Sequence, residues 1–252
     1  MSARSDRKKQ LALAGGPTDE KPGTAAKVLS QIIERSARVQ GPAVKAYVDR
    51  IRADDRNASP ADIVTKLEKR YKAAVMASGA AVGSTAAMPG IGTLAAMSAV
   101  AGETVVFLEA TSLFVLAVAE VYGIPAHERE RRRALVLSVL VGEEGKRAVS
   151  DLIGRGRTGG AWIADGAATL PLPAVSQLNS RLLKYFVKRY TLKRGALAFG
   201  KVLPVGIGAA VGGVGNRMMA KRIIENARSA FGAPPSRWPA TLHVLPTAKP
   251  NP

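Results

Sequence analysis

The feature that most constrains the fold is the stretch from Ala73 to His127, which contains no lysine or arginine in a chain that has 37 of them. Its first part, residues 73–102, is a run of 30 uncharged residues, longer than the roughly 20 that an apolar helix needs to cross a bilayer. Alanine, glycine, serine and threonine dominate the run, and Pro89-Gly90 interrupts it. Weakly apolar residues broken in the middle predict a helical hairpin and not one straight span.

The second arm of the hairpin, residues 103–122, is richer in valine, leucine and phenylalanine and contains the three acids of the stretch, Glu103, Glu109 and Glu120. A carboxylate in an otherwise uncharged segment must be paired, protonated or exposed. We expect these acids to be buried and paired with basic side chains of the C-terminal half. The candidates are Arg181, Lys184 and Arg217.

Basic residues flank the hairpin, with Lys69, Arg70 and Lys72 before it and four arginines within residues 129–133 after it. Positive flanks favour a cytoplasmic location for both ends. Residues 73–122 therefore insert in a bilayer and return, lie along its surface, or form the core hairpin of a soluble domain. The sequence leaves these alternatives open.

One helical domain between two tails accounts for the chain. A length of 252 residues suits a single domain, and 47% hydrophobic residues are enough for a core, which must use mainly aliphatic residues because aromatics make up only 5%. We predict an all-α fold with small-residue (Gly/Ala) helical hairpins over residues 25–232. Residues 1–24 form a disordered basic tail and residues 233–252 a proline-rich tail.

Local signals predict where helices begin and end. Residues 25–53 read as two helices interrupted at Gly41-Pro42, and Ser59-Pro60-Ala61-Asp62 is typical of a helix start. Residues 128–160 read as one charged helix that ends in glycines. Pro171 and Pro173 predict a short or broken helix over residues 161–177.

Glycines four residues apart predict a close contact between two helices. Gly208 and Gly212 lie in one small-residue segment, and Gly79 and Gly83 lie in the first arm of the hairpin. Glycines at this spacing let two helix backbones approach each other. We expect the two segments to pack together.

A basic face in the C-terminal half predicts a polyanionic partner. The net charge is +18, and cations recur at helical spacing on two segments. The residues are Arg181, Lys184, Lys188, Arg217, Lys221 and Arg222. They either bind anionic lipid or a partner protein, or form the solvated side of core helices.

Catalytic and cofactor sites are not predicted. The chain has no cysteine and only two histidines, His127 and His243, which leaves little from which to build a metal site or a catalytic triad. Residues 154–159 match G-x-G-x-x-G literally, but the flanking sequence lacks the strand and helix of a dinucleotide site. We expect no enzyme activity, no cofactor and no metal.

Two blocks resemble the EcsC protein family. The first contains Pro89-Gly90-Ile91-Gly92-Thr93, Glu103-Thr104 and Ala119-Glu120-Val121-Tyr122-Gly123. The second runs from Lys201 to Gly213 and continues with Asn216, Arg222 and Ala227-Arg228. The resemblance covers roughly residues 60–232 and implies a bacterial, all-helical protein without an assigned reaction, whose family is named for an ABC-transporter operon. The arginine-rich residues 128–157 have no match in it.

The expected function is therefore binding. The first hypothesis is a membrane-associated protein at the cytoplasmic face of the inner membrane, or in the cytoplasm, that grips anionic lipids or a membrane-protein partner and serves an ABC transporter as an accessory. The alternative is a soluble, basic nucleic-acid-binding protein, which the charge also suits.

Overall fold

The computed structural model describes residues 41–55, 57–86, 93–124, 128–153, 170–198 and 207–239, together with Gln31 and Ile163. Side chains are described throughout these ranges except at residues 41, 80–86, 93–101, 103, 153, 189–198 and 207–214. The described part contains seven helices and no strand, which confirms the predicted all-α fold. The helices are α3 Gly41–Ala53, α4 Pro60–Ala86, α5 Thr93–Val121, α6 Arg129–Val141, α7 Glu143–Ile153, α9 Leu172–Ala198 and α10 Ile207–Phe231. The predicted tail over residues 1–24 lies outside the described residues.

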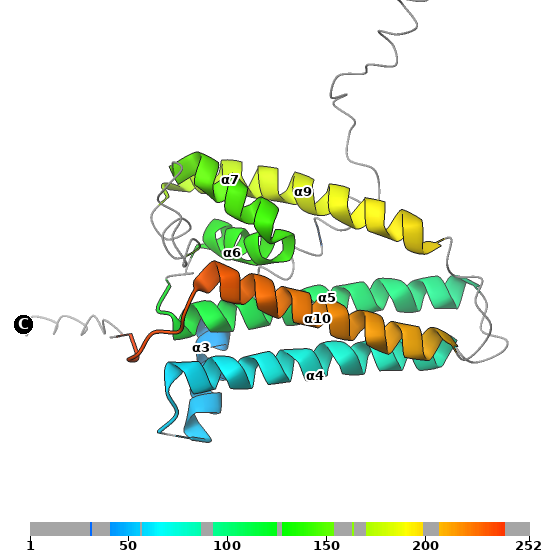
Figure 1. The fold of residues 1–252 in the computed structure, drawn as a ribbon, viewed down its shortest axis with the longest axis horizontal. Helices are drawn as coiled ribbons and strands as arrows, with labels where there is room; N and C mark the ends of the chain where they lie inside the picture. The colour runs from blue at the N-terminus through cyan, green and yellow to red at the C-terminus, as the bar shows by residue number, and fades with distance from the viewer. Residues whose placement is uncertain are drawn as a thin grey trace, which may run out of the picture.

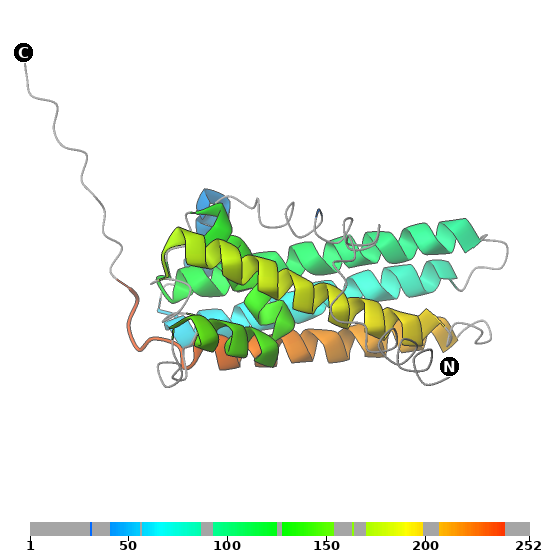
Figure 2. The ribbon, with the colours of Figure 1, turned by 90° about the horizontal axis from the view of Figure 1, so that it is seen from above.

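Three long helices, α4, α5 and α10, lie side by side and form the base of the molecule (Figures 1 and 2). α4 and α5 run in opposite directions and form the expected hairpin. α6 packs on α5 and α10, and α9 and α7 cover α6 from the other side. The C-terminal end of α4 and the N-terminal ends of α5 and α10 therefore meet at one end of the molecule.

α6 is the central helix of the core. All eight residues from Ala134 to Val141 are buried, so this half of the helix contacts protein on every side. The predicted single helix over 128–160 is wrong, because Gly142 has a positive φ of 74° and separates α6 from α7. A side chain at Gly142 would also collide with Asn226, whose Nδ2 donates to the Val139 carbonyl at 2.9 Å.

α9 begins at Leu172, immediately after Pro171, and runs for 27 residues. The prediction of a short or broken helix is therefore wrong for residues 172–177, whereas residues 161–169 lie outside the described residues except for Ile163. Both prolines lie at the start of the helix, where a missing N–H leaves no intrahelical hydrogen bond unmade. Asn179 fastens α9 to α6, because its Nδ2 donates to the Glu130 carbonyl at 3.0 Å and to Glu130 Oε2 at 2.7 Å.

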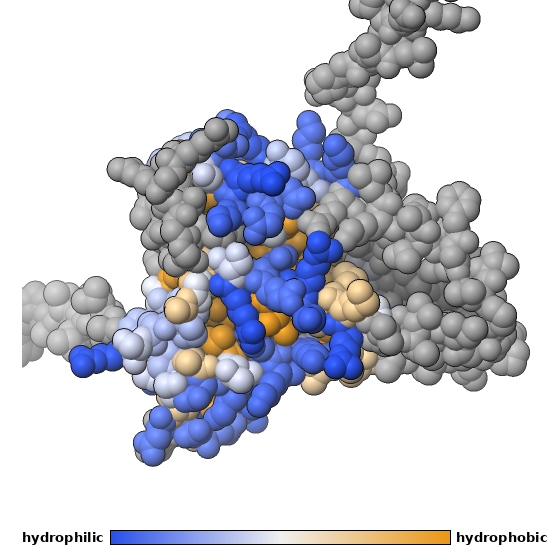
Figure 3. Space-filling model, viewed as in Figure 1, coloured by the Kyte–Doolittle hydropathy of each residue, from blue (hydrophilic) through white to orange (hydrophobic). Residues whose placement is uncertain are grey.

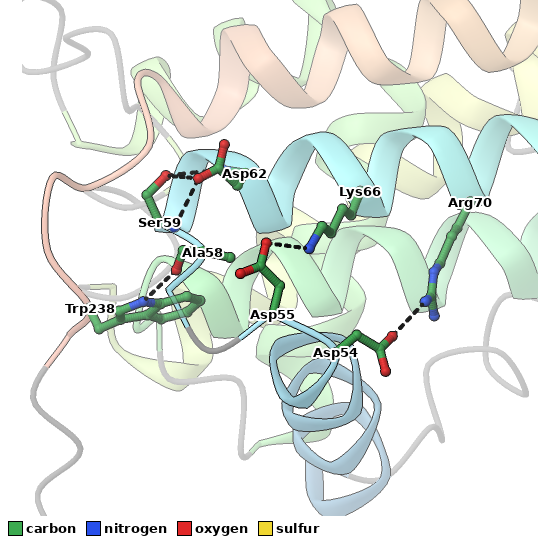
Figure 4. A network of polar contacts seen from close by, with 8 residues as sticks. All are labelled: Asp54, Asp55, Ala58, Ser59, Asp62, Lys66, Arg70 and Trp238. Carbon is green, nitrogen blue, oxygen red and sulfur yellow. Dashed lines mark hydrogen bonds and ion pairs between the residues drawn. The ribbon is translucent and has the colours of Figure 1, made fainter.

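The predicted start of α4 at residues 59–62 is confirmed. The Asp62 N–H donates to Ser59 Oγ at 3.3 Å, and the Ser59 N–H donates to Asp62 Oδ2 at 2.9 Å (Figure 4). This reciprocal pair satisfies two N–H groups at the helix start. The hydrogen bond from the Ser59 hydroxyl lowers the pKa of Asp62.

α10 packs more closely on α4 than on any other described helix. Gly79 of α4 is buried, and a Cβ there would overlap the side-chain amide of Asn216, with Asn216 Cγ only 2.8 Å away. Asn216 Nδ2 donates to the Val75 carbonyl at 3.1 Å. The helices that carry the four predicted packing glycines therefore do pack together, but the surroundings of Gly83, Gly208 and Gly212 lie outside the described side chains.

Residues 233–239, assigned from sequence to a proline-rich tail, lie against the body of the protein. Trp238 Nε1 donates to the Ala58 carbonyl at 3.3 Å (Figure 4). The Arg52 guanidinium lies 3.8 Å from the centre of the Trp238 ring. The contacts of the partly buried Trp238 ring offset the conformational entropy that residues 233–239 lose on packing against the body. The ordered part of the C-terminus therefore extends at least to Pro239.

Two glycine substitutions test the α4–α10 contact. Gly79→Ala should destabilise the protein by about 1–3 kcal/mol, because the new methyl group displaces Asn216. Gly215→Ala should stabilise it by up to about 1 kcal/mol, since Gly215 is exposed in a helix and a Cβ there meets no atom within 4 Å. Denaturant unfolding followed by circular dichroism measures both. Equal effects would mean that the backbones do not approach closely at Gly79.

Candidate functional site

The buried acid of the described core is Glu68 of α4, which the sequence analysis did not identify. Its side chain is 10% exposed, and it pairs with Arg228 of α10 through two hydrogen bonds, Nε to Oε1 at 2.7 Å and Nη2 to Oε2 at 2.5 Å. The Arg228 side chain is 66% exposed. The two-pronged pair satisfies a carboxylate inside the bundle while its partner stays hydrated.

Of the three acids predicted to be buried, Glu109 and Glu120 have described side chains, and neither is fully buried. Glu109 is exposed, because it lies on the outer stripe of α5 with Gly102 and Val106, at positions four and seven residues apart. Glu120 is half-buried, and neither acid forms an ion pair with a described residue. The predictions of burial for Glu109 and of pairing with Arg181, Lys184 or Arg217 are therefore wrong for these two acids. The side chain of Glu103 lies outside the description.

The one small pocket that stands out in the described part adjoins the Glu68–Arg228 pair. Val64, Phe114, Tyr122 and Phe231 are among the residues that line it, and about 10 Å³ is free for the centre of a water molecule. This is room for about one water and not for a substrate. Tyr122 donates a hydrogen bond to the Gly232 carbonyl at 2.8 Å, and burial, with a smaller contribution from the Glu68 charge, raises the pKa of Tyr122 to about 12.

No candidate metal site is present among the described residues. No three histidine or acidic side chains there gather closely enough to hold a metal ion. The glycine motif at residues 154–159 and both histidines lie outside the described residues. The described clusters of polar side chains fasten helices to one another.

The six predicted basic residues are all exposed, in two groups of three, one on α9 and one on α10. Arg181, Lys184 and Lys188 lie on the outer side of α9, whose inner side buries Leu182 and Phe186 against the core. Arg217, Lys221 and Arg222 lie on the exposed surface of α10. Among described residues, Lys221 is the one of the six that has an ion pair, with Glu225 at 3.7 Å. Hydrophilic residues accordingly cover much of the described surface of α9 and α10 in Figure 3.

Among the described residues, one helix is long and apolar enough to cross a membrane. The window Thr104–Val121 of α5 meets this test by length and composition, yet 67% of it is buried inside the protein. Helix α5 is packed against α3, α4 and α6, as a core helix is. Its hydrophobicity is therefore explained within the described fold.

No family model matches the sequence, and neither a curated protein nor a solved structure matches it. The resemblance to the EcsC family stays a prediction from the two blocks of residues.

Removing each partner of the buried ion pair should have unequal effects. Arg228→Met leaves the Glu68 carboxylate buried without a cation, and we expect a loss of about 2–3 kcal/mol of stability, less than for a fully buried pair because Arg228 is partly exposed. Glu68→Gln leaves the guanidinium hydrated and should cost less. A double-mutant cycle in urea measures the coupling between them. Equal losses would show that burial of Glu68 does not set the cost.

Ionisation of Tyr122 should destabilise the protein at alkaline pH. Its pKa is raised from 10 to about 12 on folding, so its contribution to stability is complete below pH 10 and is lost as the pH rises towards 12. Tyr122→Phe should therefore lose less stability over this window, although it starts about 1 kcal/mol lower without the hydrogen bond. Unfolding curves at several pH values measure the difference. Identical pH dependence would contradict the raised pKa.

Proposed function

We propose that this protein binds the surface of anionic membranes through the exposed cations of α9 and α10, without catalysing a reaction. The observation that carries the proposal is the set of six exposed cations, five of which have no acidic partner among the described residues. Cations without local partners are free to contact lipid phosphates, and each contributes about 1 kcal/mol near an anionic surface.

Two further features support a lipid surface as the partner. Tyr185 lies among the α9 cations and is 47% exposed, and an aromatic ring with a polar tip suits the boundary between headgroups and acyl chains. The small pocket beside the Glu68–Arg228 pair holds about one water, which does not suit a small-molecule substrate. The resemblance to the EcsC family favours a bacterial protein on the cytoplasmic face of the inner membrane, in an accessory role to a transporter.

Neutralising two cations of α10 tests the proposal. Arg217→Gln with Arg222→Gln should weaken binding to vesicles rich in phosphatidylglycerol by about 2 kcal/mol, or about thirtyfold. Arg50→Gln with Arg147→Gln removes the same charge from exposed positions on α3 and α7 and should have a much smaller effect. Co-sedimentation of the full chain at physiological salt measures both.

Equal losses for the two pairs of substitutions would mean that only net charge matters, and the assignment of the surface would fail. Duplex DNA that displaces the protein from vesicles, and binds it more tightly at physiological salt, would favour the nucleic-acid alternative instead.

A further inference from the structure

Exposed apolar side chains concentrate on the three long helices. Six large hydrophobic residues are exposed in the described part, and four of them lie on α4, α5 and α10. Their exposed fractions are 37% for Met76, 45% for Val106, 69% for Met218 and 46% for Met219. Methionine at such exposure on a helix of a basic protein needs an explanation, since hydrated apolar surface is unfavourable.

These four side chains, which we term the apolar ring, lie at one level along the bundle. Asn216 of α10 hydrogen bonds to the Val75 carbonyl of α4, so Met218 and Met219 are close to the level of Met76. Tyr71 of α4 hydrogen bonds to Thr111 of α5 at 2.9 Å, so these two residues are level. Met76 lies five residues after Tyr71, and Val106 lies five residues before Thr111. Because α4 and α5 are antiparallel, Met76 and Val106 are level as well.

Beyond the apolar ring, the three helices contain no lysine or arginine. The sequences of these helix ends are residues 76–86 of α4, 93–106 of α5 and 207–216 of α10. Figures 1 and 2 agree that the three ends gather at the same end of the molecule. Gly102 and Gly215 are exposed there, and a Cβ at either would meet no other atom within 4 Å.

Cations lie at the level of the apolar ring and on the side of it that faces away from this end of the bundle. Lys69 and Arg70 are exposed on α4, and Arg217, Lys221 and Arg222 are exposed on α10. Apolar side chains backed by cations match the layering of an anionic bilayer, in which phosphates lie outside the acyl chains.

We infer that the end of the bundle formed by α4, α5 and α10 enters one leaflet of an anionic bilayer, with Met76, Val106, Met218 and Met219 at the headgroup level. This inference rests on the proposed function and adds a mode of attachment to it. At a rise of 1.5 Å per residue, the three helices extend roughly 15–20 Å beyond the apolar ring, which keeps them within one leaflet of the bilayer. Glu103 and the exposed Glu109 on α5 limit the depth, because a carboxylate in the acyl region is costly.

Single labelled cysteines test the inference, because the chain has no cysteine of its own. Met218→Cys and Ser229→Cys place an environment-sensitive fluorophore on the same side of α10, eleven residues apart, and both positions are exposed. The full chain is mixed with vesicles of phosphatidylglycerol and phosphatidylcholine that carry quenchers on the acyl chains. We expect a blue shift and strong quenching for the label at 218, and neither for the label at 229. Val106→Cys should behave like Met218→Cys if α5 enters with α10.

The outcomes separate this inference from the proposed function. Co-sedimentation with anionic vesicles, but the same emission at 218 and 229, would overturn insertion and leave surface binding intact. Absence of binding would overturn both. An equal response in vesicles of phosphatidylcholine alone would support insertion and contradict the role of the cations. A response at 218 without one at 106 would contradict entry of the three-helix end as a unit.

Discussion

The register of α10 against the rest of the bundle is the constraint on which the structure depends. The described core is built mainly from aliphatic side chains, which pack with little preference for one register over another. Directional contacts supply the preference at three levels of α10. Asn216 donates to the Val75 carbonyl of α4, Asn226 donates to the Val139 carbonyl of α6, and Arg228 grips Glu68 with two hydrogen bonds. A shift of α10 by one residue would leave a buried carboxylate and two buried carbonyls without these donors.

The same contacts determine what the outer surface presents. Because Asn216 fixes the N-terminal half of α10 beside Val75, the exposed methionines of α10 come level with Met76 of α4. Tyr71, which stacks on Phe114 with ring centres 4.7 Å apart and bonds to Thr111, does the same for α5. The apolar ring is therefore a consequence of interior pairing on the other side of each helix. A surface so positioned does not need to be assembled when a partner arrives.

Much of this fold could be predicted from sequence, and the failures have physical causes. The helix start at Ser59 and the break between the hairpin arms were predicted because short-range chemistry decides them. Gly142 was overlooked because a single glycine between an apolar run and two acids is compatible with a continuous helix until its φ is known. Pro171 and Pro173 were misread because a proline begins a helix as well as it ends one. Trp238 was placed in a tail because its partners, Arg52 and Ala58, are about 180 residues away in the chain.

The burial of the acidic residues was harder to predict, because uncharged neighbours in the sequence indicate burial less reliably than helical spacing does. Glu109 stood out because its surroundings in sequence are apolar, yet it lies on the exposed stripe of α5. Glu68 was hidden among lysines, although Val64, Tyr71 and Val75, which are four, three and seven residues away, place it on the buried side of α4. Its partner Arg228 is 160 residues away, and no local pattern predicts that pairing.

Exposed cations and exposed apolar residues act over different distances. Charges attract an anionic surface from about 8 Å away at physiological salt, whereas methionine and valine gain free energy only on contact. If the molecule binds a bilayer as we propose, the cations orient it during approach, and the apolar ring determines how long it stays bound.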